Sequence, residues 1–414
     1  MNIVLYINSF LPQIGGREMV VHHLARSYKE MGHSVRVIGP AGWSQNNAVD
    51  FGYPVYRYPS IGFSEGWRET QFDNFTNIPK RATLRTKLHE FIKLSELYLD
   101  IVLRGGDLIH AHNTYPTGYL AGHLHRLKKI PLVITPHGED IHVIPEMKFG
   151  LRLNPVLQPK ILEAVNEADA VTAISASIES SLLDAGAPSE KIHAIPNGVD
   201  VERFEQLGLP DAFEYLGVKN DSKLIVTIGN YHPRKGQEFL IRAMPKILSR
   251  HDTAKLVIIG RGQEPLQTVV DELNLADSVI LAGIIPVPVT LSALDDTLAS
   301  ILTSSHIYVS AGMDEGAEGL SLALLEAMAA SLPIVATDIS GNRDIVEEGI
   351  NGCLVPPADS SGLAEAINNL LSNESARETQ SLNAKNTALK YHWREIAKQY
   401  LDTYNNVIEK SVEK

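Results

Sequence analysis

The sequence lacks several features, and each lack excludes a class of protein. It has one cysteine, Cys353, in an apolar stretch, so no internal disulfide can form and we expect a buried, reduced thiol. It has no run of about 18 apolar residues, the length that a membrane-spanning helix needs. Its first residues lack the basic start and small-residue cleavage site of a secretory signal. These lacks predict a cytoplasmic protein without a transmembrane helix.

Positive charge is also scarce. Lys and Arg number 37 against 49 Asp and Glu, which gives a formal net charge of −12. A chain that adheres to phosphate backbones is normally basic. The sequence therefore argues against nucleic acid as a partner.

Short apolar runs alternate with amphipathic helical patterns along nearly the whole chain. This alternation is typical of parallel sheets covered by helices, so we predict an α/β protein. The length of 414 residues predicts two domains. The pattern pauses in a polar, glycine-containing passage and then restarts. We therefore expect a first domain at 1–205, a linker at 206–222, a second domain at 223–390 and a final helix at 391–414.

The segment 80–104 stands out because it carries six Lys or Arg and three Asp or Glu in an acidic protein. Two interpretations stay open. In one, Leu84, Leu88, Phe91 and Ile92 pack inward and the charges are merely solvated. In the other, the basic face meets an anionic acceptor or a membrane surface.

A dinucleotide-dependent dehydrogenase does not fit either half. After the first strand, Gly15 and Gly16 stand side by side instead of forming GxGxxG, and the second strand ends in GPAG where a ribose-binding acid would stand. In the second half Pro265 takes the place of the third glycine. His110 and His112 share one face of a strand, but no acid or cysteine pattern beside them supports a metal site, and no Asp-x-Asp is found. We therefore expect neither a redox cofactor nor a metal.

The segment EGLSLALLEAMA predicts an anion site at a helix start near Glu318 and Gly319. Unpaired amides at such a start attract phosphates. An eight-residue helical spacing rises roughly 12 Å, so Glu318 and Glu326 could contact two ends of an extended ligand, such as a nucleoside diphosphate sugar. Glu326 is the only charge in its apolar surroundings, which predicts a polar partner such as a ribose hydroxyl. The amides proposed to bind the diphosphate are those of Leu320, Ser321 and Leu322.

Three loops follow predicted strands, at the edge where open α/β sheets bind ligands. GNYHPRKG carries Arg234 and Lys235, which could neutralise a departing diphosphate without a metal. In FLPQIGGRE, Gly16 after Gly15 would let a phosphate or sugar approach the backbone. TPHGEDIH places His137 on the same rim.

These motifs, taken in order, resemble glycosyltransferase family 4. The similar segments also include ADAVTAISASIESSL, IPNGVDVERF, LVIIGRGQEP and GNRDIVEEGINGCLVPPAD, and together they span nearly the whole chain. The resemblance implies the GT-B fold, with two facing Rossmann-like domains, an interdomain cleft and a final helix that crosses back to the first domain. It also implies a metal-independent, retaining enzyme of the hexosyltransferase type. Such an enzyme moves a sugar from a nucleotide sugar to a glycan, lipid-linked or small-molecule acceptor. The resemblance also leaves room for peripheral contact with the inner face of a membrane.

The resemblance also implies roles for individual residues. Glu318 would contact the donor sugar, and Glu326 the nucleotide ribose. Lys235, helped by Arg234, would stabilise the leaving diphosphate. Gly16 would lie against the donor phosphate, and His137 would line the reaction centre.

Many family members carry an arginine where this chain has Asn230, so the phosphate clamp departs from the family pattern. Two alternatives to a transferase therefore stay open: a non-catalytic binder of nucleotide sugars, and a nucleotide-sugar epimerase on the same fold.

Overall fold

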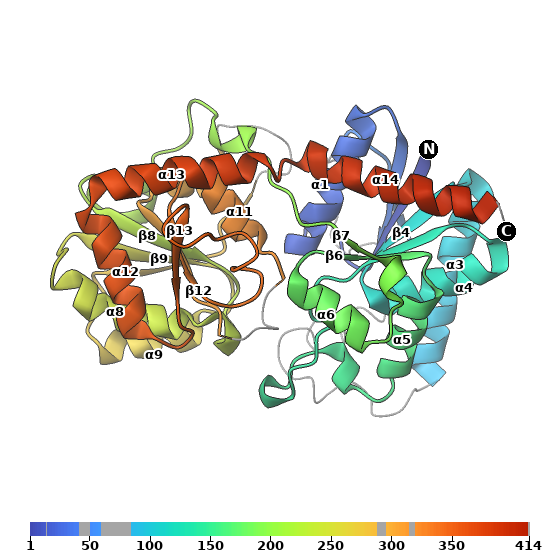
Figure 1. Cartoon of the computed structure of the whole chain (residues 1–414), viewed down its shortest axis with the longest axis horizontal. Helices are drawn as coiled ribbons and strands as arrows, with labels where there is room; N and C mark the ends of the chain where they lie inside the picture. Colours follow the sequence, from blue (N-terminus) through green and yellow to red (C-terminus); the bar gives the residue numbers. More distant parts are fainter. Residues whose placement is uncertain (14, 41–49, 59–83, 288–294, 314–318, 413–414) are drawn as a thin grey trace. The chain divides into compact units, whose positions relative to one another are not determined.

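The structure is a computed structural model that describes residues 1–13, 15–40, 50–58, 84–287, 295–313 and 319–412 (Figure 1). The chain divides into two compact units. The first combines Met1–Pro196 with Trp393–Lys414, and the second is Asn197–His392.

The first unit is built on a parallel sheet with the strand order β3-β2-β1-β4-β5-β6-β7. Its strands are β1 (Asn2–Ile7), β2 (Ser34–Pro40), β3 (Val55–Tyr58), β4 (Leu108–His112), β5 (Leu132–Thr135), β6 (Ala170–Ala173) and β7 (Ile192–Ala194). Its described α-helices are α1 (Gly16–Glu30), α3 (Leu84–Arg104), α4 (Tyr119–Lys128), α5 (Gln158–Glu167), α6 (Ala176–Asp184) and α14 (Trp393–Val412). The predicted α/β class is confirmed here, although the half-buried edge strand β3 was not predicted because its VYRY sequence is no apolar run.

The second unit repeats this architecture with the strand order β10-β9-β8-β11-β12-β13. Its strands are β8 (Lys223–Ile228), β9 (Ala254–Ile259), β10 (Val279–Gly283), β11 (Ile307–Ser310), β12 (Ile334–Thr337) and β13 (Gly352–Val355). Its described α-helices are α7 (Ala212–Leu216), α8 (Gln237–Leu248), α9 (Glu264–Glu272), α10 (Thr297–Ser304), α11 (Leu322–Ala329), α12 (Ser360–Ser372) and α13 (Glu374–Leu389). Cys353 in β13 is a free thiol and is half-buried, not fully buried as expected.

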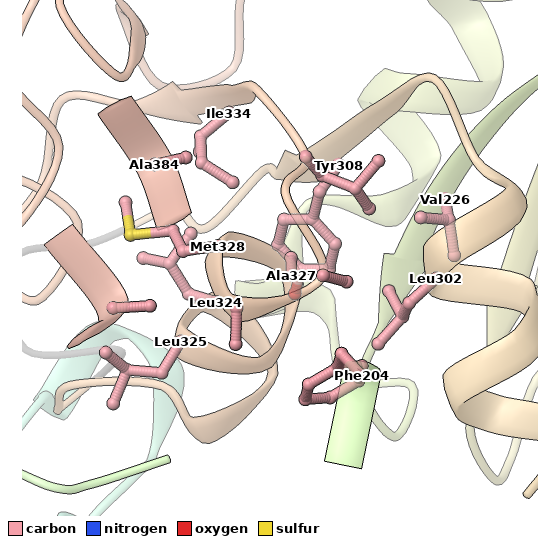
Figure 2. Packing of buried hydrophobic residues seen from close by; sticks show 14 of the residues in the cluster. Phe204, Val226, Leu302, Tyr308, Leu324, Leu325, Ala327, Met328, Ile334 and Ala384 are labelled. Atoms are coloured by element: carbon pink, nitrogen blue, oxygen red, sulfur yellow. The ribbon is translucent and has the colours of Figure 1, made fainter. Parts of the chain in front are cut away.

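One core of the second unit holds α11 in place (Figure 2). Leu324, Leu325 and Met328 have no exposed surface, and they pack with Tyr308 of β11 and Leu302 of α10. Burying one side chain of this size stabilises a fold by about 1.5–3 kcal/mol. Because these apolar residues leave Glu326 on the remaining side of the helix, the core also fixes where that carboxylate lies.

The segment expected to be a linker is part of the second unit. Ala212 of this segment is buried in the core of that unit, as are Val199, Val201 and Phe204 just before it. Asp211 caps α7 by accepting hydrogen bonds from the backbone amides of Phe213 and Glu214 at 2.8 and 3.1 Å. The division therefore falls at Pro196–Asn197, earlier than the predicted 206–222. The segment 206–222 was taken for a linker because most of it is polar, although a few of its residues are buried.

The last helix, α14, belongs to the first unit. It packs on α1, where the hydroxyl groups of Tyr28 and Tyr404 lie 2.8 Å apart. Ile396, Tyr400, Tyr404 and Val407 form its buried face, the face that their spacing indicates.

Helix α3 differs from the inward-packing interpretation of its sequence. Leu84 and Phe91 are 85% and 67% exposed, and Leu88 is exposed as well, while Ile92 is half-buried. The buried face consists instead of Leu97, Asp100 and Ile101. Within the described residues, no helix is long and apolar enough to cross a bilayer.

Candidate functional site

The loop after β8 positions the two predicted cations. Arg234 and Lys235 lie in a 3₁₀ turn, Pro233–Lys235, whose first amide donates to Nδ1 of His232 at 3.3 Å. A Cβ atom on Gly229 would lie 3.7 Å from Cε of Lys235, so the lysine side chain passes over the end of the strand. The sequence placed both cations at this rim correctly, but phosphate binding by them stays a prediction.

A glycine makes this loop pack against the one that follows β11. Gly236 has φ +64°, and a Cβ on it would lie only 1.9 Å from the carbonyl oxygen of Ala311. The Met313 amide donates to the Arg234 carbonyl at 2.8 Å. Only glycine allows this approach, which holds the backbone of both cations close to the β11 end.

Asn230, the departure from the family pattern, has a structural partner. Its side-chain oxygen accepts a hydrogen bond from the Arg261 amide at 3.0 Å, where the loop after β9 passes. Gly260 is required there, because a Cβ on it would lie 2.2 Å from the Gly229 carbonyl oxygen. Asn230 therefore joins two strand-end loops instead of adding a positive charge.

The helix of the predicted anion site begins later in the sequence than expected. Helix α11 begins at Leu322 with Ser321 as its N-cap, and Leu320 lies in the preceding turn, where its carbonyl accepts from Nδ2 of Asn197 at 2.7 Å. Glu318 lies outside the described residues, and Gly319 is the first described residue after it. The rise of roughly 12 Å assumed one helix through all eight positions up to Glu326, but α11 begins only at Leu322, so that rise does not apply.

Glu326 has a protein partner that the sequence reasoning missed. Nη1 of Arg203 donates to its Oε1 at 2.6 Å, while Nε and Nη2 of the same arginine donate to both oxygens of Asp296 at 2.6 and 2.9 Å. Burial raises the pKa of Glu326, and the charge of Arg203 opposes that rise. The predicted polar partner is therefore present, but it is Arg203, and contact with a ribose hydroxyl stays a prediction. Arg203 stands within the IPNGVDVERF segment, to which the sequence analysis assigned no site residue.

In the first unit, Gly15 and Gly16 form the start of α1. Gly15 is its extended N-cap, and a Cβ on it would lie 2.5 Å from Oε2 of Glu18. Arg17, which the sequence reasoning left out, donates from Nη2 to Ser9 Oγ at 2.7 Å, and Ser9 in turn donates to Oε1 of Glu18. A cation and a helix start thus lie together at the end of β1.

His137 lies beside a second histidine. Its Nε2 is 3.1 Å from Nδ1 of His112, and its backbone amide donates to Asp140 Oδ1 at 2.8 Å. The other Asp140 oxygen accepts from the Thr114 amide at 2.6 Å. Burial, joined by the positive charge of Arg17, holds the pKa of both histidines well below the usual value, so both are neutral at neutral pH.

His110 serves the core. Nδ1 contacts the Tyr404 hydroxyl at 2.6 Å and Nε2 the Thr135 hydroxyl at 2.7 Å. Among the described residues, no group of three or more His, Cys, Asp or Glu side chains could hold a metal ion.

Comparison with known proteins covers nearly the whole chain. The model for "Glycosyltransferase Family 4" matches residues 14–203, and the model for "Glycosyl transferases group 1" matches residues 222–373. The chain is 25% identical over 403 residues to N-acetyl-alpha-D-glucosaminyl L-malate synthase of Bacillus anthracis, which covers 96% of this chain and 95% of the relative. It is 26% identical over 402 residues to GDP-mannose-dependent alpha-(1-6)-phosphatidylinositol monomannoside mannosyltransferase of Mycolicibacterium smegmatis, covering 95% of each chain.

Among solved structures, the fold is similar to HepE of Anabaena in complex with UDP and glucose. The TM-score is 0.74 at 20% identity, covering 98% of this chain and 100% of that one.

Proposed function

The chain belongs to family 4 of the glycosyltransferases with the GT-B fold, and from that premise we propose that it transfers a sugar from a nucleotide diphosphate sugar to an acceptor hydroxyl, with retention and without a metal. The observation that carries the proposal is that the second unit holds two cations at its strand ends, beside the loop that follows β11. There Arg234 and Lys235 are held at the β8 and β11 ends, and Glu326 lies on α11. The HepE structure, which holds UDP and glucose, supports such a donor.

The donor diphosphate would be bound by Lys235 and Arg234 together with the backbone amides of Leu320, Ser321 and Leu322. Cations and oriented amides stabilise the charge that builds up as the glycosidic bond breaks. Glu326 would accept hydrogen bonds from the ribose. Glu318 with Gly319 would contact the donor sugar.

The acceptor hydroxyl would lose its proton to the departing phosphate on the same face of the sugar, so no protein nucleophile is needed. His137, which is neutral, would line this centre as a hydrogen-bond partner of the sugar, and Gly15 and Gly16 would lie against the donor phosphate. Neutral imidazole is suited to this role because it adds no charge that competes with the cations that bind the diphosphate.

Two substitutions test the chemistry. Lys235→Ala and Glu326→Ala should lower turnover by about 30- to 800-fold, the loss expected from removing a charged contact worth about 2–4 kcal/mol. Lys219→Ala, at an exposed lysine of the same unit, is the control and should change nothing. Unchanged donor binding and turnover in both site variants would refute the assignment.

The product distinguishes the alternatives. Proton NMR of the anomeric centre should show retention, and activity should survive EDTA. Release of no free nucleoside diphosphate from any nucleotide sugar would favour a binder, and a changed sugar in the recovered donor would favour an epimerase.

For the acceptor side, we propose that α3 contacts an anionic membrane. Leu84, Leu88, Phe91, Leu99 and Val102 are exposed and recur at helical spacing on one face. An exposed apolar stripe of this kind marks an interaction surface. The named phosphatidylinositol monomannoside acceptor of the mycobacterial relative supports a lipid surface as the partner.

Charge around the stripe favours anionic lipid. The acidic groups of α3 are paired within the first unit: Glu90 with Lys160, Glu96 with Lys93, and Asp100 with Arg36. Lys87 is exposed beside the stripe, and Lys128 of α4 lies 4.8 Å from the ring centre of Tyr98 on α3. A basic, apolar surface on an acidic protein is complementary to a negative bilayer.

Vesicle sedimentation tests this surface. The whole chain should co-sediment with phosphatidylglycerol vesicles at low salt and less with phosphatidylcholine vesicles. Phe91→Ser with Val102→Ser should reduce binding several-fold, while Leu207→Ser, at an exposed leucine of the second unit, should not. Absence of binding to the anionic vesicles, or a dimer through α3 in sedimentation velocity, would overturn the membrane proposal.

A further inference from the structure

A buried arginine lies between two carboxylates in the second unit. Arg203 belongs to a short 3₁₀ turn, Glu202–Phe204, far in sequence from both of its partners. Its side chain is 9% exposed, and that of Asp296 is 4% exposed. Removing charges from water in this way is costly unless each is paired with good geometry.

The geometry fixes the guanidinium on one side. Nε and Nη2 form a two-pronged contact with Asp296, and Oδ1 of that aspartate also accepts from the Ala299 amide at 3.0 Å, as N-cap of α10. A bidentate pair of this type allows little rotation of either group. The plane of Arg203 is therefore set by α10.

The third donor then sets the orientation of Glu326. Nη1 reaches Oε1 at 2.6 Å, whereas no hydrogen bond from the described residues reaches Oε2. The Glu326 side chain is 23% exposed, more than either of its partners. One oxygen is thus committed to the protein and the other is left as an oriented acceptor. Arg203 also opposes the effect of burial on the pKa of Glu326, which favours the ionised form.

We infer that Arg203 is a positioning residue for donor recognition, which holds Glu326 so that its second oxygen accepts from the vicinal hydroxyl groups of the nucleotide ribose. The inference rests on the proposed function, in which Glu326 contacts the ribose. It adds that the contact depends on a segment outside the strand-end loops and on α10 through Asp296.

Ribose discrimination tests it. Dissociation constants of the full chain are measured by calorimetry for UDP, ADP and GDP and for the 2′,3′-dideoxy form of each, with inorganic pyrophosphate alongside. The tightest-binding nucleotide should bind about 10- to 100-fold more tightly than its dideoxy form, as expected for hydrogen bonds to a charged group. Arg203→Lys keeps the positive charge but loses the forked guanidinium that orients Glu326. In this variant the ratio should fall to within about threefold, because the ribose loses its hydrogen bonds to the Glu326 carboxylate. Pyrophosphate affinity should be unchanged.

A matched control lies on the surface of the same unit. Arg242 also contacts two carboxylates, those of Glu238 and Glu272, and Arg242→Lys should leave the ratio unchanged. Glu326→Gln should remove discrimination by itself. Should Arg203→Lys fail to fold, Asp296→Asn gives the same comparison, because it removes the charge that orients Arg203.

The outcomes separate the two claims. If Glu326→Gln loses the ratio while Arg203→Lys and Asp296→Asn keep it, the positioning role is wrong and the ribose contact stands. If Glu326→Gln keeps the ratio, the ribose assignment of the proposed function is wrong, and the inference fails with it.

Discussion

The two units differ in their buried titratable side chains. In the second unit, Arg203 forms ion pairs with Asp296 and Glu326. The first unit also has a buried ion pair, Arg36 with Asp100, but it adds three histidines whose pKa values are lowered by burial, His110, His112 and His137. The comparison therefore predicts that the two units respond differently to acid.

The largest expected effect is the loss of folding stability as the pH falls. In the first unit, burial lowers the pKa of His110 to about 3 and that of His22 to about 4. It also holds the pKa values of His112 and His137 well below the usual value. A lowered folded-state pKa gives stability that is present above the unfolded value near 6.5 and is lost as the pH falls through the folded value. Each such histidine should cost at most about 1.4 kcal/mol per pH unit in that window.

The second unit should lose less over the same range. Burial raises the pKa of Glu326, and a raised carboxyl pKa gives stability that is present at low pH and lost as the pH rises. Hydrogen exchange between pH 7 and 4, corrected for the intrinsic rate, should show β4 opening before β8. Simultaneous opening of both strands would remove the contrast.

The next largest effect is at a glycine. Gly236→Ala should destabilise the second unit by about 3 kcal/mol or more, because the added methyl group meets a backbone carbonyl at 1.9 Å and the φ of +64° is strained as well. Chemical denaturation of the whole chain, followed unit by unit through hydrogen exchange, measures this.

Two controls accompany it. Gly262→Ala has a similar φ of +70° but no atom nearer than 3.9 Å, so it should cost only about 1 kcal/mol. In the first unit, Gly15→Ala meets only the movable Glu18 side chain in extended backbone, and it should cost about 1 kcal/mol or less. Equal losses in Gly236→Ala and Gly262→Ala would mean that strain, not the close approach, decides the effect.

The smallest effect concerns the neutral pair of the first unit. In His112→Asn the amide nitrogen takes the place of Nδ1 and can still contact His137, whereas in His112→Gln it takes the place of Nε2 and cannot. We expect turnover to fall about fivefold in the Gln variant and little in the Asn variant, since a lost hydrogen bond is worth about 1 kcal/mol. Similar turnover in both variants would show that His112 does not act through His137.

Much of the fold follows from local patterns, because buried parallel strands have unbroken apolar sequences. β1, β8 and β12 are runs of this kind. The loops that follow these strands were found as well, since a glycine or a cation after such a run is a local signal. The edge strand β3 is short and half-polar, so it gave no such signal.

Contacts between residues that lie far apart in the sequence could not be predicted. Arg203 and Glu326 are 123 positions apart, so no spacing rule connects them, and Glu326 was assigned a ligand in place of its arginine. The same limit explains the misplaced linker, which is anchored by single buried residues such as Ala212. Helix α3 was misjudged for another reason: several of its faces carry leucines, and only the packing of Leu97 and Ile101 identifies the inner one.

The place of α14 has a consequence for synthesis of the protein. The buried hydroxyl of Tyr404 completes hydrogen bonds to His110 and Tyr28, so the interior of the first unit needs a helix that leaves the ribosome after the whole second unit. The nascent chain therefore exposes an incomplete first unit while residues 197–392 are being made, and the second unit can finish folding before the one that precedes it.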